Sequence, residues 1–108
     1  MEENEVRTAL AAELEELIAL QTASAESRAP VELDQATQGR LSRMDALQVQ
    51  AMALETQRRR ELRRSRILAT LDRLEAGEFG ACVLCGEEIE PKRLAVDPTS
   101  PTCVDCAR

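Results

Sequence analysis

Four cysteines near the C-terminal end of the chain are the residues whose type and spacing point to chemistry. They form two Cys-x-x-Cys pairs, Cys82-Val-Leu-Cys85 and Cys103-Val-Asp-Cys106, with 17 residues between the pairs. Two such pairs at this separation are typical of a zinc site with four thiolate ligands. Zn²⁺ takes four ligands in a tetrahedron, and two intervening residues let one turn offer two sulfur atoms to the same ion. The sequence therefore predicts one zinc ion held by all four cysteines.

The predicted zinc has a structural role, because four protein ligands leave no coordination position for water or a substrate. The alternative is a pair of disulfide bonds. Paired Cys-x-x-Cys motifs in a cytosolic chain favour metal over disulfides. A redox Cys-x-x-Cys motif is usually single and lies in a βαβ unit, which this sequence does not predict. Gly86 follows the first pair, where a residue that tolerates φ > 0 lets backbone N–H groups face the sulfur atoms.

The composition argues against an enzyme. The chain of 108 residues has no His, which excludes a His-based general acid or base and a Ser–His–Asp triad. It has no Gly-rich phosphate loop. The acidic N-terminus, Met1–Glu5, does not resemble a secretory signal, and no apolar run approaches the roughly 20 residues of a membrane helix. We expect a soluble, cytoplasmic, non-enzymatic protein that does not enter a membrane.

The elements that must position the cysteines are predicted to be helices. Residues 2–28 contain no Gly or Pro and are rich in Ala, Leu and Glu, which favour helix. An apolar stripe recurs at steps of 4, 4 and 3 along this segment. The stripe consists of Val6, Leu10, Leu14 and Leu17. A connection over about residues 29–40 follows this predicted helix, since the residue before Pro30 is disfavoured in a helix.

A second helix is predicted over about residues 41–76. Its first half has a heptad-like seam at Met44, Leu47, Ala51 and Leu54. Gly77 is well placed to end this helix. The apolar pattern of the second half consists of Leu62, Ile67, Leu68, Leu71 and Leu74.

The predicted fold is mainly α: an antiparallel two-helix coiled-coil hairpin over residues 1–77, followed by a small four-cysteine zinc finger over residues 78–108. The chain has a single aromatic residue, so a thick layered core is not expected. Neither helix buries its stripe alone, and a short connection favours antiparallel neighbours. The hairpin predicts a monomer, whereas the alternative is that the helices pair with a second copy of the chain.

Charge is distributed unevenly along the chain. The net charge of −6 divides into −6 over residues 1–33, +3 over residues 34–76 and −3 over residues 77–108. Such a chain does not resemble a general DNA-binding protein, whose affinity comes largely from neutralising phosphates. The run Arg58–Arg66 contains six Arg. It is either a docking face for an acidic or phosphate surface or a solvated face that pairs with Glu2, Glu3 and Glu5.

The finger segment resembles the DksA/TraR family of zinc-finger transcription regulators. The resemblance rests on Cys82-x-x-Cys85-Gly86, Ile89, Arg93-Leu94, Pro98 and Cys103-x-x-Cys106, about a quarter of the chain. It implies a protein that inserts a helical hairpin into the secondary channel of RNA polymerase and modulates initiation without reading DNA sequence. Some members of the family act together with ppGpp, so the resemblance also makes ppGpp a candidate partner.

The resemblance also implies functional residues at the tip of the hairpin. Asp34-Gln35-Ala36 resembles the second half of the family's Asp-x-x-Asp-x-Ala tip, so Asp34 and Ala36 are the predicted tip residues. Val31 stands where the family has its first acid. The stretch from Asp34 to Cys82 is longer than in the founding members of the family, which makes Asp45 an alternative apex. Asp34 also suits the N-cap of the second helix. Longer members of the family place a helix after the finger, and contacts made by such a helix are not expected here.

Two other functions stay open from the sequence. One is a nucleic-acid-binding zinc module, which the negative charge and the single aromatic residue disfavour. The other is a zinc-stabilised scaffold that dimerises through its helices. The salt dependence of nucleic-acid binding and the mass of the protein in solution distinguish these two functions from a monomeric regulator of RNA polymerase.

Overall fold

Two long helices and two short ones make up the structure, a computed structural model that describes residues 2–23 and 40–108, with side chains from residue 44 onward in the second range. An isolated antiparallel bridge joins Ala81 to Glu88, and the described residues contain no named strand. The predicted mainly helical fold is confirmed. Asp34, Ala36 and all but the last residue of the predicted connection lie outside the described residues. The helices are α1 (Glu3–Ala23), α2 (Arg40–Ala76), α3 (Pro91–Val96) and α4 (Val104–Ala107).

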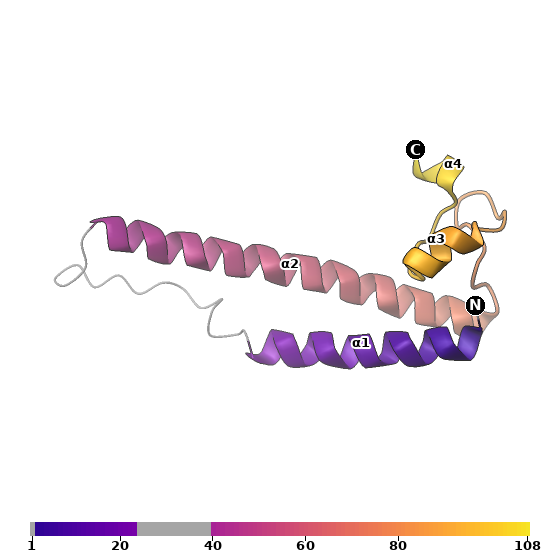
Figure 1. Cartoon of the computed structure of the whole chain (residues 1–108), viewed down its shortest axis with the longest axis horizontal. Coiled ribbons are helices and arrows are strands. Elements are labelled where there is room, and N and C mark those ends of the chain that lie inside the picture. The colour runs from indigo at the N-terminus through magenta and orange to yellow at the C-terminus, as the bar shows by residue number, and fades with distance from the viewer. Residues whose placement is uncertain (1, 24–39) are drawn as a thin grey trace. The chain divides into compact units, whose positions relative to one another are not determined.

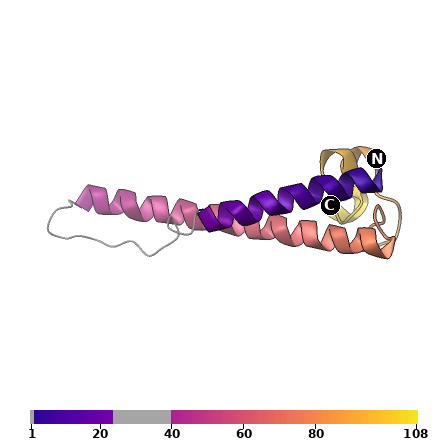
Figure 2. The same cartoon turned by 90° about the horizontal axis from the view of Figure 1, so that it is seen from below.

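The described chain divides into two compact units. One unit contains Met1–Glu15 and Arg64–Arg108, and the other contains Glu16–Arg63. Within the first unit, α1 begins beside the end of α2, so the two helices run antiparallel, as both views show (Figure 1 and Figure 2). The zinc-finger segment belongs to this same unit. None of the described helices combines the length and the apolar character that crossing a membrane requires.

The helix seam of the first unit is fully buried. Val6 and Leu10 of α1 are exposed by 4% and 2%, which confirms the N-terminal half of the predicted stripe. On α2, Ile67 and Leu74 are exposed by 0% and 4%. Thr70 lies between them with no exposed surface, and its hydroxyl donates to the Arg66 carbonyl at 2.8 Å. A buried hydroxyl needs such a partner, and this bond satisfies it without a group from outside the helix.

The seam predicted for the first half of α2 is wrong. Met44, Leu47 and Leu54 are exposed by 58%, 45% and 47%. The sequence pattern selected the largest apolar side chains in this part of the helix. The structure instead turns these side chains outward, which leaves a set of exposed large apolar residues on α2.

The rotation of α2 follows from its buried end. Ile67 and Leu74 are seven residues apart, and both point inward. Counting back in sevens gives Arg60, Ala53 and Ala46, which are all half-buried. A heptad step returns a helical residue to nearly the same face. Half-buried positions of α2 thus continue at a heptad spacing from its buried end.

Two arginines of the basic run pair with an acid of their own helix, α2. The Glu55 carboxylate accepts two hydrogen bonds from Arg58, at 3.0 and 2.8 Å, and one from Arg59 at 3.3 Å. The bonds from Arg58 lower the pKa of Glu55. These pairs at i,i+3 and i,i+4 are exposed, so they support the helix locally and add little to its stability.

Gly77 ends α2, as predicted. Its φ of +72° lies in the left-handed region that glycine adopts most easily. The Glu78 N–H donates to the Arg73 carbonyl at 2.8 Å, and the Gly77 N–H donates to the Leu74 carbonyl at 3.3 Å. This pair of bonds is the Schellman motif, which satisfies carbonyl groups at the end of a helix. The chain leaves α2 here in a defined direction and enters the cysteine-bearing segment.

The buried seam of the first unit makes a testable prediction about stability. Leu10→Ala is expected to lower the free energy of unfolding by about 2–5 kcal/mol, because it removes a fully buried side chain and leaves a cavity. Leu62→Ala, at a position that is 59% exposed on α2, is the matched control and should change stability little. Urea unfolding followed by circular dichroism measures both. Equal effects of the two substitutions would contradict the packing described here.

Candidate metal centre

The first cysteine pair lies in a tight hairpin over residues 80–89. The Ile89 N–H donates to the Gly80 carbonyl at 2.7 Å, and the Cys82 N–H donates to the Glu87 carbonyl at 2.8 Å. At the turn, Gly86 has a φ of +77° and donates its N–H to the Cys82 carbonyl at 2.9 Å. The left-handed conformation expected at Gly86 is confirmed, and it lets the chain reverse directly after Cys85.

The second cysteine pair lies at the start of α4. Cys103 is the residue before the helix, and Cys106 lies within it. The Ala107 N–H donates to the Cys103 carbonyl at 3.0 Å, which closes the helical turn around this pair. The Val83 N–H donates to the Pro101 carbonyl at 2.9 Å and so joins the two cysteine-bearing segments.

The core of the finger is small and consists partly of sulfur. Cys82 and Cys103 are buried together with Ile89 and Leu94, and Phe79 packs against this cluster. Burial of so few apolar side chains stabilises a module only weakly. A metal ion bound to the cysteines would supply the stability that the apolar residues cannot.

The four thiols are arranged as ligands of one ion. All four sulfur atoms lie within 4.8 Å of one another. Zinc–sulfur bonds of about 2.3 Å in a regular tetrahedron place the sulfur atoms about 3.8 Å apart. The Sγ atoms of Cys85 and Cys103 lie 3.8 Å apart, whereas a disulfide bond is about 2.05 Å long. All four cysteines are free thiols, so the geometry fits zinc and contradicts the disulfide alternative.

Hydrogen bonding within the cysteine cluster lowers the pKa of one thiol and raises that of another. Hydrogen bonding from the Cys103 backbone lowers the pKa of Cys82 to about 6. Hydrogen bonding to the thiols of Cys103, Cys85 and Cys82 raises the pKa of Cys106 far above its usual range. Four thiolates cannot share this space without a cation, because each added negative charge opposes the next. Metal binding at neutral pH must therefore displace protons from this cluster.

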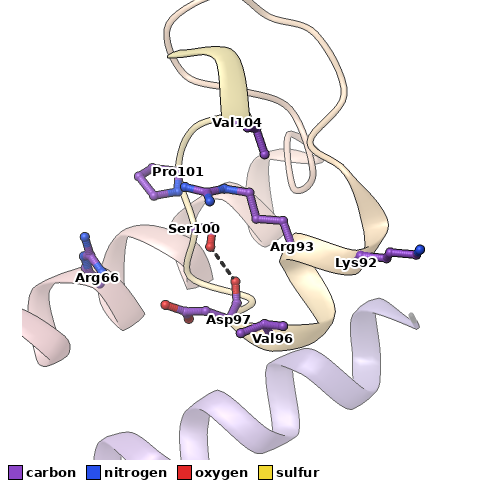
Figure 3. A pocket seen from close by; sticks show the side chains of 8 residues that line it. All are labelled: Arg66, Lys92, Arg93, Val96, Asp97, Ser100, Pro101 and Val104. Atoms are coloured by element: carbon purple, nitrogen blue, oxygen red, sulfur yellow. Dashed lines mark hydrogen bonds between the residues drawn. The ribbon is translucent and has the colours of Figure 1, made fainter. Parts of the chain in front are cut away.

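A pocket of about 480 Å³ lies beside the metal centre (Figure 3). Three basic side chains line it, with one carboxylate: Arg66 from α2, Lys92 and Arg93 from α3, and Asp97. The Ser100 hydroxyl donates to the Asp97 carbonyl at 2.8 Å, which fixes the loop below α3. Sequence patterns group Arg66 with the run Arg58–Arg66, whereas the structure places it with residues of the finger.

The structure thus brings together the four predicted metal-binding cysteines. Asp45, the alternative tip residue, is exposed on α2. Glu90 is not a predicted site residue, yet its carboxylate accepts a hydrogen bond from the Val104 N–H at the second cysteine pair. No motif signals this contact, because it joins residues 14 positions apart across an irregular segment.

Zinc content and its structural effect can be measured on the purified chain. We expect one zinc per chain, and we expect Cys82→Ser to unfold residues 78–108 while most of the signal from α1 and α2 remains, because the metal replaces a larger core. Elemental analysis and hydrogen exchange measure the two effects. Ala107→Ser, at an exposed position of α4, is the control and should keep its zinc. A zinc-free parent protein with a protected finger would contradict the prediction.

Comparison with protein families agrees with this geometry. Residues 77–108 match the model of the prokaryotic DksA/TraR C4-type zinc finger. Among curated proteins, the RNA polymerase-binding transcription factor DksA of Haemophilus influenzae is 41% identical over 63 residues, which cover 56% of this chain and 43% of that protein. The protein of the same name from Escherichia coli is 38% identical over 63 residues, which cover 56% of this chain and 42% of that protein. The matched segment thus spans less than half the length of these relatives.

The fold also resembles that of a solved structure. Transcription factor DksA2 from Pseudomonas aeruginosa superposes with a TM-score of 0.74 at 21% sequence identity, over 97% of this chain and 79% of that chain. This similarity covers the long helices as well as the finger. The chain thus has a helical fold similar to that of DksA2, and its residues 77–108 match the DksA/TraR C4-type zinc finger, with a structural zinc site at the four clustered cysteines.

Proposed function

We propose that this chain is a non-enzymatic regulator that binds bacterial RNA polymerase through its secondary channel and modulates initiation without reading DNA sequence. The observation that carries the proposal is the finger over residues 77–108, which matches the DksA/TraR type on a fold similar to that of DksA2. The matching curated relatives are named RNA polymerase-binding transcription factors. Such a partner would place the chain in the cytoplasm.

In this proposal the zinc ion stabilises the base of the hairpin. Cys82, Cys85, Cys103 and Cys106 are its four proposed ligands, and they leave no open coordination position. The finger and the buried seam of α1 and α2 belong to the same compact unit. Metal binding therefore contributes to folding of the end of the hairpin that carries the finger, and it supplies no reaction chemistry.

Exposed apolar side chains on α2 support a macromolecular partner. Met44, Leu47, Met52 and Leu54 are each exposed by 45% or more within the second unit. Single exposed apolar residues are common, but a concentration of large ones on a single helix is typical of an interaction surface. A helix of this kind can pack against protein helices of a partner.

Charge favours a protein partner over DNA. The net charge of −6 becomes −6 − 4 + 2 = −8 when four thiolates bind one Zn²⁺. Phosphate groups of a duplex would be repelled by such a chain, because DNA affinity depends on neutralising phosphates with Lys and Arg. We therefore expect regulation without direct recognition of DNA sequence.

Asp34 and Ala36 remain the proposed tip residues, by resemblance to the family motif. A carboxylate brought near the Mg²⁺-dependent centre of the polymerase would change the local charge, and Coulomb forces grow as water is excluded. A small side chain at Ala36 would let the tip approach the channel wall.

ppGpp is a candidate second ligand of the same system. The pocket of Figure 3 brings Arg66, Lys92 and Arg93 together, and Arg and Lys are the side chains that bind phosphate. Asp97 in the same pocket opposes an anion. Measuring promoter-complex lifetimes with and without ppGpp decides whether the nucleotide contributes.

Binding to RNA polymerase is the first functional prediction. The zinc-loaded chain immobilised on resin should retain bacterial core RNA polymerase, and the Cys82→Ser variant should retain less, because its finger is unfolded. Resin without protein is the control. Absence of retention by the zinc-loaded chain would contradict the proposed function.

Two further measurements identify the alternatives. Sedimentation at several protein concentrations should give the mass of one chain, whereas a dimer would favour the scaffold. Filter binding to single- and double-stranded nucleic acid should show no strong affinity at low salt, whereas affinity that falls steeply with salt would favour a nucleic-acid-binding module.

The tip assignment makes the second functional prediction. Asp34→Asn should leave thermal stability and polymerase affinity nearly unchanged, because Asn retains the size and much of the capping ability of Asp. The same substitution should abolish the effect of the chain on the lifetime of promoter complexes, since the charge is lost. Asp45→Asn is the matched control. Normal regulation by Asp34→Asn together with loss in Asp45→Asn would move the tip to Asp45, and normal regulation by both would exclude an acidic-tip mechanism.

A further inference from the structure

The short helix α3 holds the second cysteine pair from both sides of Cys103. The Arg93 Nε–H donates to the Thr102 carbonyl at 2.9 Å. The Val104 N–H donates to the Glu90 carboxylate, at 3.2 Å to the nearer oxygen. Thr102 and Val104 are the residues directly before and after Cys103. The backbone on both sides of this cysteine is therefore hydrogen-bonded to the N-terminal end of α3, through Arg93 and the preceding residue Glu90.

The two attachment points are themselves fixed relative to the first cysteine pair. Glu90 is the residue before α3, and its carbonyl accepts the N–H groups of Arg93 at 2.9 Å and Leu94 at 3.2 Å. Leu94 is buried in the core cluster that also contains Ile89 and Cys82. The hydrogen bonds that Glu90 and Arg93 make beside Cys103 therefore connect this cysteine to Cys82 through α3, which packs against the same core cluster.

The neighbouring base on α3 does not share this arrangement. Figure 3 shows the Arg93 side chain reaching toward Pro101 and Val104, whereas the Lys92 side chain points away from them. Lys92 directly precedes Arg93 in the sequence, carries the same charge and is exposed. Both residues therefore place a positive charge near the finger, but of the two it is Arg93 that donates a hydrogen bond beside the second cysteine pair.

We propose that Glu90 and Arg93 are positioning residues of the metal centre, which hold Cys103 in ligand geometry and slow the release of zinc. A thiol that is already 3.8 Å from its neighbour needs little reorganisation to complete a tetrahedron. Residues that orient metal ligands usually change metal affinity 10- to 100-fold when they are substituted. The proposal concerns the metal site alone and does not depend on binding to RNA polymerase.

The rate of zinc release from the full zinc-loaded chain tests the proposal. A chromophoric chelator in excess reports release directly. Glu90→Ala and Arg93→Met should each release zinc about 10-fold faster than the parent, because each removes one attachment of the second pair. Lys92→Met removes the same charge as Arg93→Met without removing that contact, so its release rate should equal that of the parent. If Arg93→Met does not fold, Glu90→Ala decides, since the Glu90 side chain is exposed.

A conservative variant separates positioning from general destabilisation. Glu90→Gln loses the charge but keeps an oxygen that can accept from the Val104 N–H, so it should restore the parental release rate. Cobalt-loaded Glu90→Ala should keep the absorption spectrum of tetrahedral thiolate coordination, because the four ligands are unchanged. The proposal is overturned if Glu90→Ala and Arg93→Met release zinc at the parental rate. It is also overturned if Glu90→Gln is as fast as Glu90→Ala, or if Lys92→Met is as fast as Arg93→Met.

Discussion

The clustering of four thiols is the constraint on which the rest of the finger depends. Sulfur atoms within 4.8 Å of one another repel as they ionise, so the fully ionised cluster requires a cation at its centre. The hairpin at residues 80–89 and the turn of α4 each deliver two of these sulfur atoms. Among the described residues, Ile89 and Leu94, with Phe79 beside them, supply the apolar burial around the cysteines. Metal binding is therefore the main source of stability of the finger, which lies in the same compact unit as the ends of α1 and α2.

The parts of this molecule that could be predicted from sequence are those set by local chemistry. Cys-x-x-Cys spacing, the glycine after the first pair and the glycine after α2 are all interpreted from their immediate neighbours, and the structure shows the expected conformations at Gly86 and Gly77. The same holds for Val6 and Leu10, which lie in the stripe of α1 and are buried. These features depend on a few neighbouring residues, so one sequence is enough to interpret them.

The inward face of α2 could not be predicted in the same way, because it depends on long-range packing. The pattern at Met44, Leu47 and Leu54 is a good local heptad, yet these side chains point outward. Ile67 and Leu74 are buried whereas Leu62 and Leu68 are exposed, and the residue types alone do not distinguish the two pairs. The contact between Glu90 and Val104 is equally hidden, since it joins two irregular segments. Tertiary packing determines both.

The inward face of α2 has a consequence for dynamics. Val6, Leu10, Ile67 and Leu74 bury large side chains in the first unit, whereas no described residue of the second unit is fully buried. Opening the second unit locally therefore exposes little apolar surface and costs little free energy. The backbone amides of its described helical residues, 16–23 and 40–63, should exchange with solvent through small fluctuations well below global unfolding. A segment of this kind can change its helix pairing to suit a binding surface while the zinc-bearing unit keeps its fold.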